Sequence, residues 1–350
     1  MFSTYTYHQP FELESGHQLA SLHLGYTSYG QLNEERNNVV WVFHALTANS
    51  DPAEWWPGLI GKDKIFDPRD YFIICVNMPG SCYGSIGPLE KNPVTGAAYF
   101  HQFPFFTIKD MVKSYQLLKK ELGIQKIQIG IGGSMGGQQL LEWAATEPYL
   151  FENAIALATN AFHSAWGIAF NASQRLAIEN DSTWIQNDNK AGINGMKTAR
   201  AIALLSYRNY ETYKQKQSEE ITDKITDFKS ETYQQYQGAK LALRFNAFSY
   251  YFLSRSMDSH HLGRHRKNVS AALSNISAKT LILSISSDIL FPPEEQRFLS
   301  ENIPNAVFQS IHSSYGHDGF LLEFEQIEKA IIQFLNREHI QQNKFQNVIK

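Results

Sequence analysis

Cysteine is scarce in this sequence, which has only two among its 350 residues. Cys75 lies in an apolar run and Cys82 in the loop just after it, an arrangement typical of neither a disulfide framework nor a metal site. We expect Cys75 to be a small buried hydrophobic residue. The sequence also lacks a Walker motif, a dinucleotide fingerprint and the paired His and Glu of a metal site, so we expect no metal and no cofactor.

Long apolar runs and an excess of positive charge are missing as well. No run approaches the roughly 20 apolar residues that a membrane span needs, and the N-terminus lacks the features of a signal peptide. The formal net charge is −3, which leaves no large basic field for nucleic acid. We therefore expect a cytoplasmic protein that binds neither membranes nor nucleic acid.

Short apolar runs, in contrast, recur along the chain and are typical of strands covered on both faces. An amphipathic pattern at residues 108–122 predicts a crossover helix, and residues 11–30 predict an antiparallel hairpin that turns at Ser15 and Gly16 and opens the sheet. The remaining strands are expected at residues 39–43, 71–76, 154–158, 280–285 and 308–311.

Residues 163–275 contain no comparable apolar run, but they contain several helix-like stretches rich in Gln, Tyr, Lys and Glu. An inserted helical cap explains this composition. The sequence therefore predicts an α/β fold with a mostly parallel central sheet. Its main domain is expected to comprise residues 1–162 and 276–350, with the cap, or lid, at residues 163–275.

Ser134 lies in the run Ile-Gly-Gly-Ser-Met-Gly-Gly at residues 131–137, between a strand-like and a helix-like stretch. Such a G-x-S-x-G element forms a nucleophile elbow, a sharp turn whose strained backbone lifts the serine hydroxyl out of the fold. The flanking glycines leave room for the strand and helix to approach each other. The pattern predicts an enzyme that transfers acyl groups through Ser134.

A serine nucleophile needs a base, and the base needs a carboxylate to orient it. Asp288 follows a predicted strand, where an orienting acid belongs, although a turn or N-cap role before Pro292 is an equally good explanation of Asp288 alone. His317 follows the last predicted strand in a Gly-His-Asp-Gly loop. The order Ser134, Asp288, His317 favours a catalytic triad.

Acyl transfer also needs backbone amides that stabilise the oxyanion. The amide of Met135, directly after the nucleophile, is one candidate. The amide of Leu46, in the loop after the strand at 39–43, is the other. We expect His44 to shape this loop and not to serve as the base.

These residues together resemble the homoserine O-acetyltransferases of the α/β-hydrolase superfamily. The resemblance spans most of the chain and implies an α/β-hydrolase fold. It rests on an ordered series of short motifs: His44-Ala45-Leu46-Thr47, Trp55-Trp56-Pro57-Gly58, Cys82-Tyr83-Gly84, the glycine-rich run at 132–137, Leu141-Glu142-Trp143, Tyr236-Gln237-Gly238, Met257-Asp258-Ser259, Leu290-Phe291-Pro292-Pro293 and Gly316-His317-Asp318.

The resemblance implies a ping-pong reaction in methionine biosynthesis. Ser134 would take the acetyl group of acetyl-CoA, the acyl-donor substrate, and pass it to the hydroxyl of L-homoserine, giving O-acetyl-L-homoserine. It further implies that Arg200 and Asp318 bind the amino acid, because a guanidinium suits a carboxylate and an aspartate suits an ammonium group. It also implies a homodimer that forms through the cap helices.

Several alternatives stay open at this stage. The same triad would serve a homoserine O-succinyltransferase, a serine O-acetyltransferase or, with water as acceptor, a carboxylesterase-type hydrolase. Met78, Pro79 and Ser81 depart from the residues usual in this family, which leaves the preferences for donor and acceptor open. A catalytically silent binding module is disfavoured because it would not need a complete triad.

Overall fold

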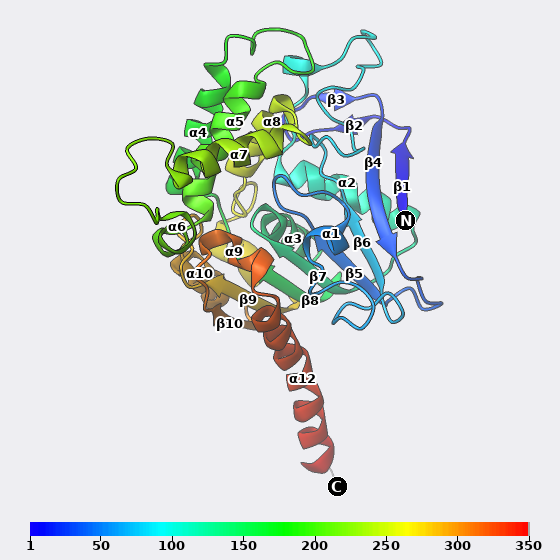
Figure 1. Ribbon diagram of the computed structural model, residues 1–350. Coiled ribbons are helices and arrows are strands. Elements are labelled where there is room, and N and C mark those ends of the chain that lie inside the picture. Colours follow the sequence, from blue (N-terminus) through cyan, green and yellow to red (C-terminus); the bar gives the residue numbers. More distant parts are fainter. Residues whose placement is uncertain (349–350) are drawn as a thin grey trace.

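The computed structural model describes residues 1–348, and their side chains as far as residue 336. An eight-stranded sheet forms the centre of the molecule (Figure 1). The first two strands in its spatial order are antiparallel to their neighbours, and the other six are parallel. The spatial order is β1 (Phe2–Tyr7), β4 (Leu22–Tyr29), β6 (Phe72–Val76), β5 (Val39–Phe43), β7 (Ile127–Gly133), β8 (Phe151–Leu157), β9 (Lys279–Ile285) and β10 (Ala306–Ile311).

The predicted parallel strands are confirmed, but the prediction for residues 11–30 is wrong in one respect. The chain does turn at Ser15 and Gly16, yet β2 (Phe11–Glu12) and β3 (Gln18–Leu19) form a separate two-stranded sheet. The main sheet begins instead with β1, which pairs with β4. Residues of β1 are exposed or half-buried throughout, so this edge strand lacks the buried face that would reveal it in the sequence.

Alternation along β5 explains why helices cover both faces of the sheet. Trp41 and Phe43 pack on one face with α2 (Ile108–Glu121) and α3 (Met135–Thr146), whereas Val42 packs on the other. Buried residues of α9 (Val269–Ser274) and α10 (Pro293–Asn302) join the first core, and those of α12 (Phe324–Val348) join the second, where Trp56, just after α1 (Pro52–Trp55), also lies. Helix α2 begins where Thr107 and Asp110 form a capping box.

Between β8 and β9 the chain forms helices and no strand. Five of these helices pack on one another and lie together beyond one end of the sheet (Figure 1). The sixth, α9, packs against α10. All six lie within the predicted cap at 163–275, whose boundaries stay a prediction. The five cap helices are α4 (Ala165–Glu179), α5 (Ile193–Tyr207), α6 (Tyr210–Gln217), α7 (Lys229–Ala242) and α8 (Ala247–Asp258).

Over the described residues, none of the helices combines the length and the apolar character that crossing a membrane requires. Cys75 is fully buried, as the sequence predicts. Three short helical segments complete the fold: η1 (Phe100–Gln102), η2 (Gly316–Asp318) and α11 (Gly319–Leu322).

Candidate active site

Ser134 lies at the sharp turn between β7 and α3 and adopts φ 57° and ψ −127°. Residues other than glycine rarely adopt a positive φ, so the backbone at Ser134 is strained. Two hydrogen bonds hold it, because the Ser134 amide donates to the Leu157 carbonyl at 3.0 Å and the Thr159 hydroxyl donates to the Ser134 carbonyl at 2.8 Å. The predicted elbow is therefore present.

Gly136 allows α3 to begin this close to the sheet. A Cβ atom at residue 136 would lie 2.1 Å from the carbonyl oxygen of Phe43, at the end of β5. Only glycine fits such an approach. Met135, the first residue of α3, is fully buried beside this contact, at a helix end where backbone amides have no partner within the helix.

Asp288 serves two partners at once. One carboxylate oxygen accepts hydrogen bonds from the amides of Leu290 and Phe291, at 2.8 and 2.9 Å. The other accepts one from Nδ1 of His317, at 2.6 Å. The turn role and the triad geometry, which the sequence presented as alternatives, thus occur together. In the neutral tautomer that donates from Nδ1 to Asp288, Nε2 of His317 carries the lone pair that a base needs.

Aromatic rings fix the plane of the His317 imidazole. Phe291 stacks on it, with ring centroids 4.9 Å apart and an angle of 19° between the planes. Phe320 contacts it edge-on at 5.2 Å, and Tyr207 of the cap lies at 5.9 Å. The ring is therefore held by the cap as well as by the catalytic domain.

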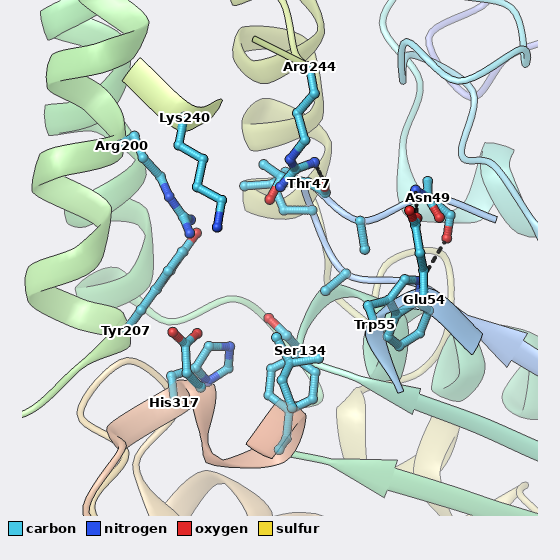
Figure 2. Close-up of a pocket in the computed structure, with 16 residues that line it drawn as sticks. Thr47, Asn49, Glu54, Trp55, Ser134, Arg200, Tyr207, Lys240, Arg244 and His317 are labelled. Atoms are coloured by element: carbon cyan, nitrogen blue, oxygen red, sulfur yellow. Dashed lines mark hydrogen bonds between the residues drawn. The ribbon is translucent and has the colours of Figure 1, made fainter. Parts of the chain in front are cut away.

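A cavity of about 480 Å³ opens between the cap and the carboxyl ends of the strands. Ser134 and His317 both lie at its floor, and Arg200 and Lys240 extend from cap helices toward them (Figure 2). Leu46 and Asp318 also line this cavity. The structure thus brings five of the seven predicted residues to one cavity, with Asp288 behind His317 and Met135 at the start of α3.

The two predicted substrate residues differ in their surroundings. The Arg200 guanidinium lies over the Tyr207 ring, 5.3 Å from its centroid. Asp318 forms an ion pair of 3.1 Å with Arg208, the residue directly after α5. The cavity therefore presents a cation and an anion beside the serine.

Sequence reasoning missed the part that Arg208, Lys240 and Arg244 play at this site. Nothing in the sequence shows that Arg208 reaches Asp318. Lys240 and Arg244 lie four residues apart on and just after α7, and both line the cavity. A spacing of four residues places side chains on one face of a helix, but it does not reveal what that face meets.

His44 shapes the loop after β5, as predicted. Its Nδ1 donates to the Ala45 carbonyl at 2.9 Å, and its Nε2 accepts from the amide of Met78 at 3.0 Å. Burial lowers the pKa of His44 to about 4, so the ring is neutral and both hydrogen bonds persist at neutral pH. The loop thus held carries Leu46 into the cavity.

Arg244 reaches the same loop from the cap. Its guanidinium donates to the carbonyl of Thr47 and to the Tyr83 hydroxyl, the latter at 2.7 Å. Among the described residues no group of three or more His, Cys, Asp or Glu side chains could hold a metal ion. The expectation that the chain uses neither a metal nor a cofactor stays a prediction.

Comparison with known proteins places this fold and site in a class. The sequence pattern of the alpha/beta hydrolase fold matches residues 38–324, so the chain is an α/β-hydrolase-fold protein with a serine at its nucleophile elbow. A protein of Cyclobacterium marinum named homoserine O-acetyltransferase is 49% identical over 326 residues, which cover 93% of each chain. The chain belongs to the homoserine O-acetyltransferase family.

Solved structures agree with this fold. A homoserine O-acetyltransferase from Staphylococcus aureus is 29% identical, with a TM-score of 0.79 and 96% of each chain covered. An acetylester hydrolase from Corynebacterium glutamicum is 23% identical, with a TM-score of 0.85 and 95% of each chain covered. At that lower identity the likeness shows the fold alone.

Proposed function

We propose that this chain transfers an acetyl group from acetyl-CoA to the hydroxyl of L-homoserine through an acetyl-Ser134 intermediate. The observation that carries the proposal is the shared cavity, in which Ser134 and His317 lie beside Arg200 and Asp318. A cation and an anion near a nucleophile suit the carboxylate and ammonium groups of an amino acid. Membership of the homoserine O-acetyltransferase family supports the same acceptor.

In the first half-reaction, Nε2 of His317 takes the hydroxyl proton of Ser134 as its oxygen attacks the thioester carbonyl. The amides of Leu46 and Met135 are the proposed donors to the resulting oxyanion. When the carbon–sulfur bond breaks, His317 returns the proton to the departing thiolate. Asp288 holds the tautomer required for both steps through its contact with Nδ1.

In the second half-reaction, the homoserine hydroxyl attacks the acetyl-enzyme and His317 removes its proton. Arg200 binds the carboxylate of the amino acid, and Asp318 accepts hydrogen bonds from its ammonium group. Before homoserine arrives, Arg208 compensates the charge of Asp318. His317 then protonates Ser134, which leaves the enzyme as it began.

Hydrolysis is the alternative outcome, because water could attack the same acetyl-enzyme. A similar fold occurs in the acetylester hydrolase from Corynebacterium glutamicum, so the fold does not separate the two activities. Arg200 and Asp318 favour transfer, because water carries no carboxylate or ammonium group that such a pair of opposite charges could bind. Succinyl as donor and serine as acceptor remain competitors within the same chemistry.

The experiment is to incubate the purified chain with acetyl-CoA and L-homoserine and to measure free thiol. Thiol release that depends on homoserine and yields O-acetyl-L-homoserine supports the proposal. Release indifferent to homoserine would point to hydrolysis, and no release would reject an acyl-CoA donor. Parallel reactions with succinyl-CoA and with L-serine decide the donor and the acceptor.

Two further expectations belong to the proposal. A homodimer through the cap is supported by large apolar side chains that the cap exposes, and sedimentation velocity would test it. A cytoplasmic location stays a prediction from the sequence. These exposed apolar side chains of the cap include Trp166, Leu176, Leu205, Tyr236 and Leu243.

A further inference from the structure

A second cavity of about 530 Å³ lies on the cap side of the loop that carries His317. Half of its lining residues lie on α6, and Tyr233 of α7 contributes as well. Tyr315, two residues before the histidine, lines it from the catalytic domain. Neither the predicted triad nor the predicted substrate residues belong to this cavity, so the proposed reaction does not account for it.

The lining combines cations with aromatic rings and contains no Asp or Glu. Arg208 and Lys216 supply positive charge, and the Arg208 guanidinium also lies 6.0 Å from the centroid of the Tyr315 ring. Tyr213 and Tyr233 form an edge-to-face pair, with centroids 6.1 Å apart. Such a surface suits a ligand that has a flat ring and a negative charge.

The two cationic side chains that line this cavity have few partners within the protein. The Nε atom of Arg208 is buried and has no hydrogen-bond partner, although the Nη2 atom pairs with Asp318. Lys216 makes no hydrogen bond or ion pair with any described residue. A buried guanidinium N–H without a partner is costly, so Arg208 has an incentive to turn toward an anion bound in the cavity that its side chain lines.

We propose that this cavity binds a small organic anion that carries an aromatic ring, with Arg208 and Lys216 holding the charge and the tyrosines packing on the ring. An amino acid fits it poorly, because no carboxylate in the lining can accept from an ammonium group. The cavity is therefore not a second acceptor site.

Binding in this cavity would also affect acceptor binding, a consequence that rests on the proposed function. An anion beside Arg208 would offset the positive charge that now compensates Asp318. Asp318 would then bind the homoserine ammonium more strongly, which lowers KM for homoserine about threefold. By thermodynamic linkage, homoserine would tighten binding of the anion by the same factor.

Phenyl phosphate is a suitable probe, because it joins a ring to a phosphate, and titration calorimetry on the whole chain would measure its binding. We expect saturable binding at one site and a weakening of about fivefold in Lys216→Ala. Lys214→Ala is the matched control, since Lys214 lies on the same helix but contacts Tyr210 outside the cavity and should leave the affinity unchanged.

Three outcomes would overturn the proposal. The first is the absence of saturable binding. The second is equal affinity for inorganic phosphate, which would remove the role of the ring. The third is weakening by Lys240→Ala and not by Lys216→Ala, which would place the probe in the catalytic cavity.

The binding measurement needs no turnover, so it separates this site from the proposed function. Saturable binding that depends on Lys216, in a chain that fails to acetylate homoserine, would support the site and reject the function. Homoserine transfer by a chain that does not bind phenyl phosphate would support the function and reject the site. The coupling is tested by measuring KM for homoserine with and without the probe, and an unchanged or raised KM contradicts it.

Discussion

At the scale of single residues, Asp288 connects the local turn to the proposed chemistry. Its carboxylate holds two backbone amides and the imidazole of His317. Asp288→Asn can keep the backbone contacts through its carbonyl oxygen but would then present an N–H group to Nδ1. The imidazole must then adopt the wrong tautomer, and we expect kcat to fall about 10,000-fold.

Thiol release from acetyl-CoA in the presence of homoserine measures this effect. The matched control is Asp63→Asn, because Asp63 is an exposed carboxylate that pairs with Arg69. A variant Asp288→Asn that keeps more than about a tenth of the rate would contradict the role of Asp288 as the orienting acid.

Arg200 gives a second prediction at this scale. Arg200→Ala removes the proposed carboxylate contact and should raise KM for homoserine about 100-fold, while acetylation of the enzyme by acetyl-CoA stays intact. Arg297→Ala is the control, since the Arg297 side chain lies over Phe308 away from the cavity. Loss of the acetylation step in Arg200→Ala would show that the arginine does not act on the acceptor alone.

The sequence could predict Ser134, Asp288 and His317, because strand ends and chain order determine where triad residues fall. It could not predict the ion pair between Arg208 and Asp318, which joins the end of a cap helix to a loop much later in the chain. Such contacts depend on how the cap sits over the sheet.

At the scale of elements, the end of α5 rests directly on the loop of His317. Gly316 has φ +64°, and a Cβ atom there would lie 2.9 Å from backbone atoms of Tyr207 and Arg208. Gly316→Ala should therefore lower the free energy of unfolding by about 2–4 kcal/mol, since it adds a collision to backbone strain. It should also reduce kcat by displacing His317.

Gly16→Ala provides the matched comparison. Gly16 has φ +81°, but no atom lies within 4 Å of the added Cβ. Backbone strain alone applies, and the free energy of unfolding should fall by about 1 kcal/mol. Urea unfolding of both variants measures the difference. Equal costs would show that the approach of α5 to the loop does not constrain residue 316.

Strands with two buried faces were predictable, and the edge strand β1 was not. All five residues of β5 are buried, so their apolar run is visible in the sequence. Strand β1 has one neighbour and no buried residue, and its pairing with β4 therefore leaves little trace in the hydrophobic pattern.

At the scale of the whole molecule, buried histidines couple stability to pH. Burial lowers the pKa of His44 and His163 to about 4 and that of His260 to about 3. His163 and His260 are hydrogen-bonded to each other through the backbone, where the chain enters and leaves the cap. All three stay neutral in the folded state but take up a proton near pH 6.5 when the chain unfolds.

The unfolded state therefore binds more protons than the folded state below about pH 6.5. The free energy of unfolding decreases as the pH is lowered through this window. Each histidine should remove roughly 2 kcal/mol between about pH 6.5 and pH 5. Burial raises the pKa of Asp258 and of Glu295, which acts in the opposite direction at the acid end of the window. Urea unfolding at pH 7, 6 and 5 tests the sign, and equal or greater stability at pH 5 would contradict it.

The run of helices between β8 and β9 could be predicted from the sequence, because strand runs stop before residue 163 and resume after residue 275. How the cap closes over the cavity did not follow. Three cations line the cavity from the cap: Arg200 of α5, Lys240 of α7 and Arg244 just after α7 (Figure 2). Only the packing of these helices over the sheet determines which of their side chains point into the cavity.

The central claim is that Ser134 carries the acetyl group and delivers it to homoserine. The most direct measurement is mass spectrometry of peptides from chain exposed to acetyl-CoA alone and then chased with L-homoserine. We predict that acetyl appears on Ser134 and then leaves as an equal amount of O-acetyl-L-homoserine. No label on Ser134, or a label lost to water at a rate that homoserine does not change, would contradict the claim.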